Sequence, residues 1–483
     1  MVAFPIEIMA AEARPLTPLV VRHQHALLPT DATIAAELEA ELGGDVFGGD
    51  VHSDDGLVDG VRQDVAIDRL RHFCPDLSAA RRLVWWQAFA IAAAFALLGA
   101  GLALAPGLTV ATVFALGTLP SLAFLALRLA AMRQLLEPAQ AVRPTGAAAC
   151  ETVIAPSDGA PDTPHYTVLV PLYREAPVVP QLVAALEALD YPPARLDVML
   201  IVEHDDAATR DAIRRSAPPS HMRVVVVPPG LPRTKPRALN HALSFAGGEF
   251  VVVFDAEDQP EPDQLRKALA VFRSSPANLG CLQARLNVYN PAASWLTRQF
   301  AIEYMALFDG ILPALERYRL PVMLGGTSNH FPRAVLESVH GWDPYNVTED
   351  ADLGLRLARR GYHVGVLAST TWEEAPEAYG VWLGQRTRWL KGWMQTYLVH
   401  MRQPLRLWRE LGARRFLAFN LLTGGVVLSA LVHPWIYIAL TWDVAAGQAF
   451  AVREGVLGSA VWWFAAFNLL ASYGAAIALG AVA

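Results

Sequence analysis

The stretch FVVVFDAED, residues 250–258, joins a run of apolar residues to a cluster of carboxylates. The run predicts a buried strand, and in open α/β sheets ligands bind beyond the carboxyl ends of the strands. Carboxylates at positions i and i+2 there can both reach one hard cation, which makes Asp255 and Glu257 candidate ligands of Mg²⁺ or Mn²⁺. The alternative is an acidic turn that ends the strand and caps the helix near residues 262–265.

Similar apolar runs alternate with helical patterns through residues 160–390. Continuous apolar strands that alternate with helices imply a mostly parallel sheet covered on both faces, so we predict an α/β domain here. The predicted strands are Tyr166–Val170, Val198–Val202, Val224–Val227, Phe250–Phe254 and Cys281–Leu286.

Four long uncharged segments flank this domain in two pairs. About 20 apolar residues span a bilayer, so we predict four transmembrane helices. They fall at residues 83–105 and 108–127, within a region 83–130, and at 416–442 and 457–482, within a region 416–482. For the first pair, the alternative is a buried helical hairpin of a soluble protein.

Arginines indicate the orientation of these helices. Arg81 and Arg82 precede the first pair, Arg128 and Arg133 follow it, and the turn at residues 106–107 has none. The positive-inside rule then places the N-terminal arm and the central domain on the cytoplasmic side of a bacterial inner (plasma) membrane.

The remaining segments are less regular. Residues 1–80 are acidic and predict an accessory or partly disordered region. Residues 391–415 mix aromatic and basic side chains, which favours an interfacial amphipathic helix broken near Pro404, or else a partner-binding helix.

The composition of the 483 residues supports this organisation. Hydrophobic residues make up 53% and the mean hydropathy is +0.29, as in integral membrane proteins. The net charge of −7 gives no bulk basic footprint for nucleic acid. The three cysteines are scattered, which fits a reducing compartment, and the N-terminus lacks the pattern of a cleaved signal peptide.

Two further acidic clusters fall at predicted strand or helix ends. Residues 203–206, Glu-His-Asp-Asp, follow the second strand, and Thr348-Glu349-Asp350 opens a helical pattern. Thr348 can be a simple N-cap with the acids favouring the helix dipole. The functional alternative makes Asp350 a general base held in place by the start of the helix.

Cationic and aromatic residues complete the pattern. Gln385, Arg388 and Trp389 stand at i, i+3 and i+4, so they share one helical face. Arg388 can neutralise a diphosphate leaving group and Trp389 can stack on a sugar ring; the alternative is an interfacial Trp/Arg pair. Lys235 lies between the third strand and a helix, where it is either a phosphate ligand or a solvated surface lysine.

With these motifs, residues 160–442 resemble family 2 glycosyltransferases, in the processive cellulose-synthase-like branch. The resemblance implies a GT-A nucleotide-sugar fold between transmembrane helices, a divalent metal and inversion at the anomeric carbon. It makes Asp350 the catalytic base, with Glu349 and Thr348 in the same motif. It assigns Lys235, Asp255 and Arg388 to the nucleotide sugar, Asp255 and Glu257 to the metal, and Gln385, Trp389, Thr327, Ser328 and Asn329 to the acceptor.

One motif departs from the family pattern, because Glu203-His204-Asp205 stands where the family has Asp-Asp-Gly. Glu203 is our candidate for recognising uracil, and Asp205 is the alternative candidate. We expect transfer of a hexose or N-acetylhexosamine from a UDP-sugar to a growing polysaccharide, with membrane lipids and other polysaccharide export subunits as further candidate partners. The alternatives are single addition to a lipid-linked acceptor and an inactive membrane scaffold.

Overall fold

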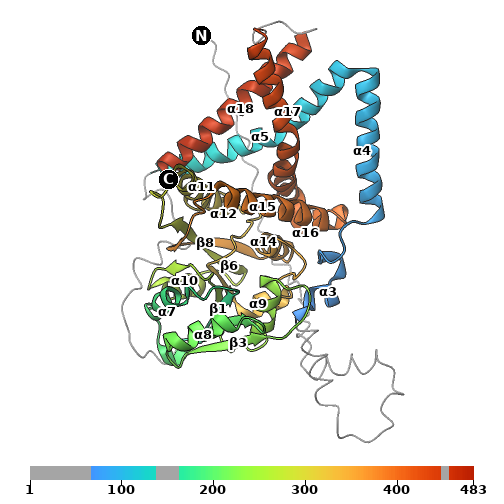
Figure 1. Cartoon of the computed structure of the whole chain (residues 1–483). Helices are drawn as coiled ribbons and strands as arrows, with labels where there is room; N and C mark the ends of the chain where they lie inside the picture. The colour runs from blue at the N-terminus through green and yellow to red at the C-terminus, as the bar shows by residue number, and fades with distance from the viewer. Residues whose placement is uncertain (1–66, 138–162, 448–455) are drawn as a thin grey trace, which may run out of the picture. The chain divides into compact units, whose positions relative to one another are not determined.

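The computed structural model of the chain describes residues 67–137, 163–447 and 456–483 (Figure 1). Most of the predicted accessory region at residues 1–80 therefore lies outside the described residues. Its end forms a short helix α3 (Arg69–Phe73) and a 3₁₀ turn η1 (Pro75–Leu77).

An eight-stranded sheet forms the centre of the domain, in the order β3-β2-β1-β4-β7-β6-β8-β5. Strands β1 to β4 are parallel to one another, β7 runs antiparallel to both its neighbours, and β6 and β8 are parallel. The mostly parallel sheet was predicted, and all five predicted strands are present. The strands are β1 (Tyr166–Leu172), β2 (Leu196–Glu203), β3 (Met222–Val227), β4 (Phe250–Val253), β5 (Gln259–Pro260), β6 (Leu279–Val288), β7 (Asn329–Pro332) and β8 (His363–Glu373).

Helices cover both faces of this sheet. Successive residues of a strand point to opposite faces, so each face contributes to its own buried cluster. In β1, Val168 and Val170 belong to one buried cluster and Leu169 to the other. The surrounding elements are α7 (Val179–Glu187), η2 (Pro193–Arg195), α8 (Ala207–Ser216), α9 (Lys235–Leu243), α10 (Gln264–Ser274), α13 (Arg333–Ser338) and α14 (Glu349–Arg359).

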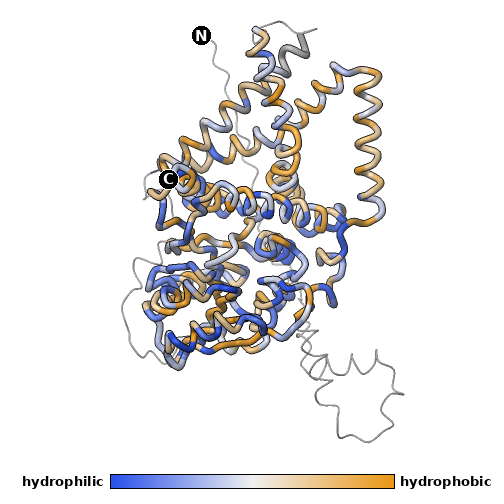
Figure 2. Tube along the Cα trace, viewed as in Figure 1, coloured by the Kyte–Doolittle hydropathy of each residue, from blue (hydrophilic) through white to orange (hydrophobic). Residues whose placement is uncertain are grey.

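Four helices are long and apolar enough to cross a membrane. They comprise α4 (Trp85–Leu104), α5 (Pro106–Leu136), α17 (Gly425–Ala445), which continues from α16, and α18 (Val456–Val482). Helices α17 and α18 both pack against α5. Figure 2 shows α4 as an almost continuously hydrophobic tube, and Trp85, Phe89 and Phe95 on it are exposed, as a lipid-facing helix requires.

Two helical stretches lie between the sheet and these long helices. One is continuous from α11 (Trp295–Met305) through the π-helical η3 (Ala306–Ile311) to α12 (Leu312–Arg317), and it contacts α5 and α18. The other consists of α15 (Tyr379–His400), α16 (Pro404–Phe419) and the π-helical η4 (Asn420–Gly424). The segment 391–415 therefore divides between α15 and α16, with the break directly before Pro404.

Candidate active site

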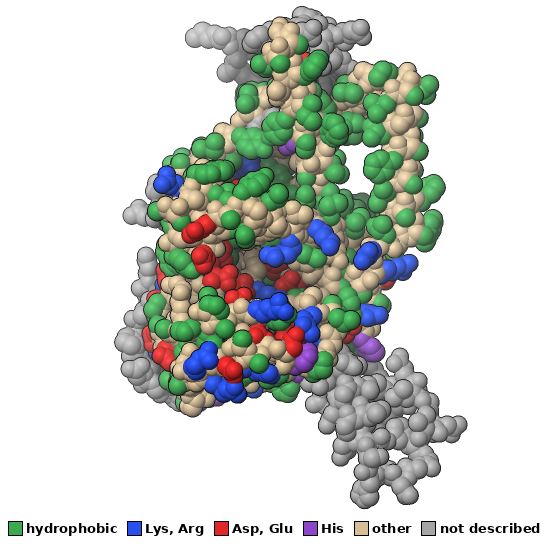
Figure 3. All heavy atoms as spheres, viewed as in Figure 1, with side chains coloured by type: hydrophobic (Ala, Val, Ile, Leu, Met, Phe, Trp, Pro, Cys, Tyr) green, Lys and Arg blue, Asp and Glu red, His purple; other side chains and the backbone are tan. Residues whose placement is uncertain are grey.

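Three loops meet at the carboxyl ends of the parallel strands. Lys235 opens α9, Asp255 follows β4, and Gly326 precedes β7. The Nζ of Lys235 forms an ion pair with Asp255 and donates a hydrogen bond of 2.8 Å to the carbonyl oxygen of Gly326. On the face shown in Figure 3, acidic side chains gather around a hollow with basic side chains at its border. Lys235 is thus paired with a carboxylate and is not a solvated surface lysine.

Asp350 also lies beside Gly326. A Cβ atom placed on Gly326 would lie 3.5 Å from Oδ2 of Asp350 and 4.0 Å from Nζ of Lys235. A carboxylate and an ammonium group therefore both border the small gap at this glycine. The backbone N–H of Ala351 donates to Oδ1 of Asp350 over 2.7 Å, which orients the carboxylate at the start of α14.

Carboxylates outnumber cationic side chains around this gap. Burial raises the pKa of both Glu349 and Asp350, and repulsion from Asp350 adds to the shift of Glu349. Burial alone would lower the pKa of Lys235, but the charges of Asp255 and Glu349 raise it above its usual range. Lys235 therefore stays charged and supplies positive charge that the crowded carboxylates need.

Further carboxylates surround Asp255. Burial and repulsion from Asp255 raise the pKa of Glu257, and the same causes raise that of Asp258. Burial is also the main cause that raises the pKa of Glu373, at the end of β8, to about 8. Such mutual repulsion marks a place where additional positive charge would be stabilising.

The carboxylates around Asp255 fit a divalent cation that takes only some of its ligands from the protein. Within the described ranges, no three His, Cys, Asp or Glu residues are arranged to hold a metal ion. Oδ1 of Asp258 is buried without a hydrogen-bond partner, so uncompensated acceptor capacity lies beside Asp255. Mg²⁺ and Mn²⁺ typically take one or two carboxylates and complete their shells with substrate phosphates and water. Asp255 and Glu257 fit that role.

The end of β2 forms a second polar region. Glu203 is buried, and burial raises its pKa while Arg237 and Arg233 oppose the shift. Asp205 is half-exposed and forms an ion pair of 2.8 Å with Arg233, whose guanidinium lies 6.0 Å from the ring of Tyr173. Tyr173 follows β1, which pairs with β2, so an exposed aromatic ring lies beside Arg233, the partner of Asp205.

The loop before β7 points inward. Thr327, Ser328 and Asn329 are all buried. The hydroxyl of Thr327 bonds to Asp258 and accepts from the backbone N–H of Asp255 at 3.2 Å, while Ser328 donates to Thr371 over 2.7 Å. Thr327 thus supports the position of Asp255, while Ser328 and Asn329 bond to Thr371 and to the carbonyl oxygen of Gly325. We propose that they position the site and do not form an open acceptor surface.

The Gln-x-x-Arg-Trp motif lies in the first half of α15. Trp389 is partly buried, with its ring centroid 6.4 Å from that of Phe300. Arg388 is exposed and has no hydrogen bond or ion pair to any other residue that the structure describes. Arg386 instead lies 4.7 Å from the ring of Trp389 and pairs with Glu303. Arg388 is therefore free to meet a ligand, and one side of Trp389 is already covered by Arg386.

Thr348 is buried between α14 and α15. Its side chain makes no capping hydrogen bond to α14, and its Oγ1 has no partner in the described part of the chain. A Cβ on Gly392 would lie 2.3 Å from the side chain of Thr348, so only glycine allows this close approach. The structure thus gives Thr348 a packing role between the two motif-bearing helices.

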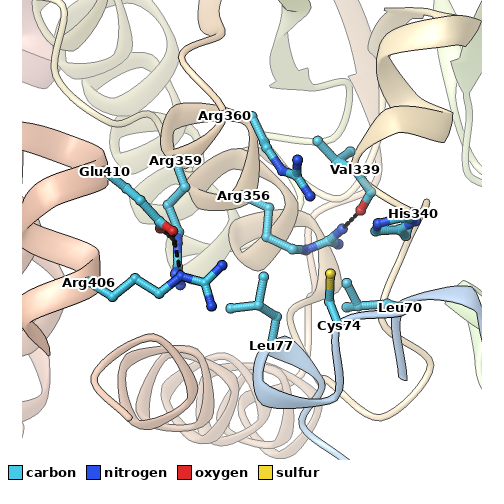
Figure 4. Close-up of a pocket in the computed structure, with 10 residues that line it drawn as sticks. All are labelled: Leu70, Cys74, Leu77, Val339, His340, Arg356, Arg359, Arg360, Arg406 and Glu410. Carbon is cyan, nitrogen blue, oxygen red and sulfur yellow. Dashed lines mark hydrogen bonds and ion pairs between the residues drawn. The ribbon is translucent and has the colours of Figure 1, made fainter. Parts of the chain in front are cut away.

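A buried ionic network fixes α14 further along. Asp352 is paired with Arg356 at 2.7 Å and with His400 of α15 at 2.8 Å, and all three are fully or almost fully buried. At the far end, Figure 4 shows Arg359 joined to Glu410 of α16, beside a small basic pocket of about 40 Å³. Because one network holds α14 to α15 and α16, the position of Asp350 is set by rigid packing.

Residues 163–392 match the sequence model of the family described as glycosyltransferase like family 2. They form a family 2 glycosyltransferase domain. The observed sheet and this match agree with the predicted α/β fold of the GT-A type.

Relatives of this family 2 domain include membrane-lipid and polysaccharide synthases. A beta-monoglucosyldiacylglycerol synthase of Synechocystis sp. is 31% identical, over 56% of this chain and 58% of that protein. The probable glycosyltransferase YdaM of Bacillus subtilis is 28% identical, over 52% and 60%. The UDP-forming cellulose synthase 1 catalytic subunit of Komagataeibacter xylinus is 26% identical, over 49% and 32%. The chain thus spans at most 60% of the length of these relatives.

A solved structure shows a weaker likeness. The mannosyltransferase PcManGT from Pyrobaculum calidifontis, in complex with GDP-Man and Mn²⁺, is 21% identical with a TM-score of 0.38. The match covers 73% of this chain and 99% of that one.

Sequence reasoning missed several residues of the family 2 domain's site. Glu373 ends β8. The sequence of this strand, HVGVLASTTWE, shows neither a continuous apolar run nor a clear alternation of apolar and polar residues, so it was not among the predicted strands. Tyr173 follows β1 directly and lies three residues after the end of the first predicted strand, so its place near a carboxyl strand end was the available signal. Arg386 lies inside the quoted motif, between Gln385 and Arg388.

The carboxylates predict a pH-dependent response to metal. The pKa of Glu373 is about 8 when folded against an ordinary 4.5, so the folded chain binds more protons between these values and loses stability as the pH rises. Metal binding needs deprotonated ligands, and burial raises the pKa of the candidate ligand Glu257 above its usual range, so the metal competes there with protons. We expect Mn²⁺ to raise the melting temperature of the full chain in detergent, and to do so more at pH 8 than at pH 6. An equal shift in wild type and Glu257→Gln at both pH values would contradict this.

Proposed function

We propose that the family 2 domain transfers a hexose or an N-acetylhexosamine from a UDP-sugar to a growing polysaccharide at the cytoplasmic face of the membrane. The observation that carries this proposal is the gap at Gly326, which is bordered by the carboxylate of Asp350 and by Lys235, the partner of Asp255. A proton acceptor and a positively charged group beside one gap are what a displacement with an anionic leaving group requires.

In the proposed mechanism, Asp350 takes the proton of the acceptor hydroxyl as its oxygen attacks the anomeric carbon. The bond to UDP breaks on the opposite side, so the configuration inverts. Lys235 and Arg388 stabilise the charge of the leaving diphosphate. A divalent cation held by Asp255 and Glu257 would supply further positive charge there. Glu203 and Tyr173 recognise the uracil ring, and Asp205 is the alternative to Glu203.

A lipid acceptor is the second candidate. The Synechocystis relative is named as a beta-monoglucosyldiacylglycerol synthase, and it is more similar to this chain than the cellulose synthase subunit is. Helix α4 also presents Trp85, Phe89 and Phe95 outward. An inactive scaffold is disfavoured, because carboxylates crowded together with raised pKa values are costly unless they serve a site.

One experiment separates these functions. Purified full-length protein is incubated with Mn²⁺ and a panel of UDP-hexoses and UDP-N-acetylhexosamines, with diacylglycerol, an oligosaccharide or no acceptor, and UDP release is measured. We expect one donor to release UDP well above the others. Stimulation by the oligosaccharide with lengthening products supports polymer synthesis, and stimulation by diacylglycerol with a single addition supports the lipid acceptor. No UDP release from any donor would contradict the enzymatic proposal.

The proposed topology has its own test. In the structure the break between α4 and α5 is at Ala105, and the predicted turn at 106–107 forms the start of α5. In a variant without the native cysteines, Gly107→Cys should react with a membrane-impermeant maleimide in intact cells. Gly247→Cys, on an exposed loop of the family 2 domain with open space around it, should react only after lysis. Labelling of position 247 from outside would overturn the cytoplasmic assignment.

A further inference from the structure

Arg128 lies among the membrane helices without an anionic partner. It belongs to α5, and within the described residues it forms no ion pair. Its Nη1 donates to the carbonyl oxygen of Ser472 in α18 over 2.8 Å, and its guanidinium lies 5.9 Å from the ring of Phe124. A charge that is taken partly out of water is costly unless it is paired, so this position favours an anionic ligand.

A second arginine on the same helix shows the ordinary alternative. Arg133 follows by five residues, its side chain is 83% exposed, and it pairs with Glu137 at 3.3 Å. That is the arrangement of an arginine that extends toward water at the membrane surface. Arg128 instead turns between α5 and α18, where its guanidinium meets a carbonyl oxygen and no carboxylate.

A cavity of about 240 Å³ lies beside Arg128. This is well above the roughly 10–15 Å³ that one water needs by the same kind of measure. Helices α5, α17 and α18 all contribute to its wall. The lining residues are Ser121, Phe124, Arg128, Val426, Ser429, His433, Ser472 and Tyr473.

The polar groups of this cavity are held in place by one another. Oγ of Ser121 lies 3.1 Å from Nε2 of His433, which joins α5 to α17. The hydroxyl of Ser472 donates to the carbonyl oxygen of Ser121 over 3.4 Å, which joins α18 to α5. A guanidinium, an imidazole and several hydroxyls fixed around one space form a donor set suited to a phosphate group.

The cavity lies toward the end of the bundle that meets the catalytic domain. From Arg128 to Leu136, where α5 ends, the helix rises about 12 Å. Helix α5 contacts η3, and Leu479 of α18 packs beside Gly310 of η3. The side chain of Tyr473, at the cavity wall, is 54% exposed. The cavity thus opens outward at a depth that lipid headgroups can reach.

We propose that this cavity binds the phosphate of an anionic membrane lipid. Inorganic phosphate offers the same acceptor oxygens, but the apolar walls at Phe124 and Val426 and the outward opening favour a phosphate that carries acyl chains. The bound phosphate supplies the counter-charge that Arg128 lacks. This site is separate from the gap at Gly326 and does not depend on the nature of the transferred sugar.

Native mass spectrometry of the full-length protein in neutral detergent tests the proposal. Phosphatidylglycerol, phosphatidylcholine or inorganic phosphate is added, and retained adducts are counted. We expect wild type to retain one phosphatidylglycerol with a preference of about tenfold over phosphatidylcholine, the scale of one charge-assisted contact. Arg128→Gln should remove this preference, and the matched control Arg133→Gln should keep it.

A second variant guards against misfolding of the first. Ser429→Phe fills the cavity while leaving Arg128 intact, and it should also lose the retained phosphatidylglycerol. Equal retention of both lipids by wild type, or an undiminished preference in folded Arg128→Gln or folded Ser429→Phe, would overturn the proposal. Displacement of the lipid by millimolar inorganic phosphate would assign the cavity to a soluble anion instead.

Discussion

Asp350→Asn is expected to lower glycosyl transfer by about 10²–10⁴-fold, the usual contribution of a positioned base. The substitution keeps the size of the side chain, and its amide oxygen can still accept from the backbone N–H of Ala351. It cannot accept a proton from the acceptor hydroxyl. UDP-sugar affinity, measured by calorimetry, and the melting temperature should therefore stay close to those of wild type while the transfer rate falls.

Asp352→Asn, two residues further along α14, is the matched control. Asp352 is fully buried between Arg356 and His400, so its substitution should lower the melting temperature as the ionic network is weakened. If Asp350→Asn lowered the melting temperature as much as Asp352→Asn, or if donor affinity collapsed in parallel with the rate, Asp350 would be a folding or binding residue.

Asp255→Ala and Glu257→Ala are each expected to abolish turnover. Together they are the carboxylates that fit a divalent cation, and charge stabilisation of a leaving group by such a cation contributes several kcal/mol. Chelation of wild type should have the same effect, and Mg²⁺ or Mn²⁺ should reverse it. The measurement is UDP release with the preferred donor at saturating concentration.

Asp263→Ala is the control for these two variants. Asp263 is a nearby acid that pairs with Lys267 at 2.8 Å in α10, away from Lys235. Its loss should leave the metal dependence unchanged. Full activity of wild type in excess chelator would remove the metal from the mechanism, and Asp255 would then remain only as the partner of Lys235.

The sheet was predictable where burial on both faces leaves a continuous apolar run. β1, β2 and β4 are almost entirely buried, and their sequences show it directly. β7 is the short segment NHFP, and it lies in the middle of the sheet because β4 and β6 pair with it. No local pattern indicates this. Thr327, Ser328 and Asn329, which the family resemblance assigns to the acceptor, lie just before and at the start of this strand, and their burial was equally without a local signal.

The site was predictable in its residue types more than in its contacts. Strand ends pointed to Asp255 and Glu257, and a helix start pointed to Asp350. The contact of Lys235 with Asp255 joins two loops, and taken alone the lysine resembled a solvated surface residue. Pairs such as Asp352 with His400 of another helix depend on tertiary packing that periodicity does not encode.

The configuration of the new glycosidic bond tests the central claim most directly. The preferred UDP-α-linked sugar is supplied to the full-length protein with Mn²⁺ and the acceptor that stimulates UDP release, and the anomeric proton coupling of the product is read by NMR. A single displacement, with Asp350 as base and the leaving diphosphate beside Lys235, predicts a β-linked product. An α-linked product would contradict the account, because the gap at Gly326 would then not serve a single inverting displacement.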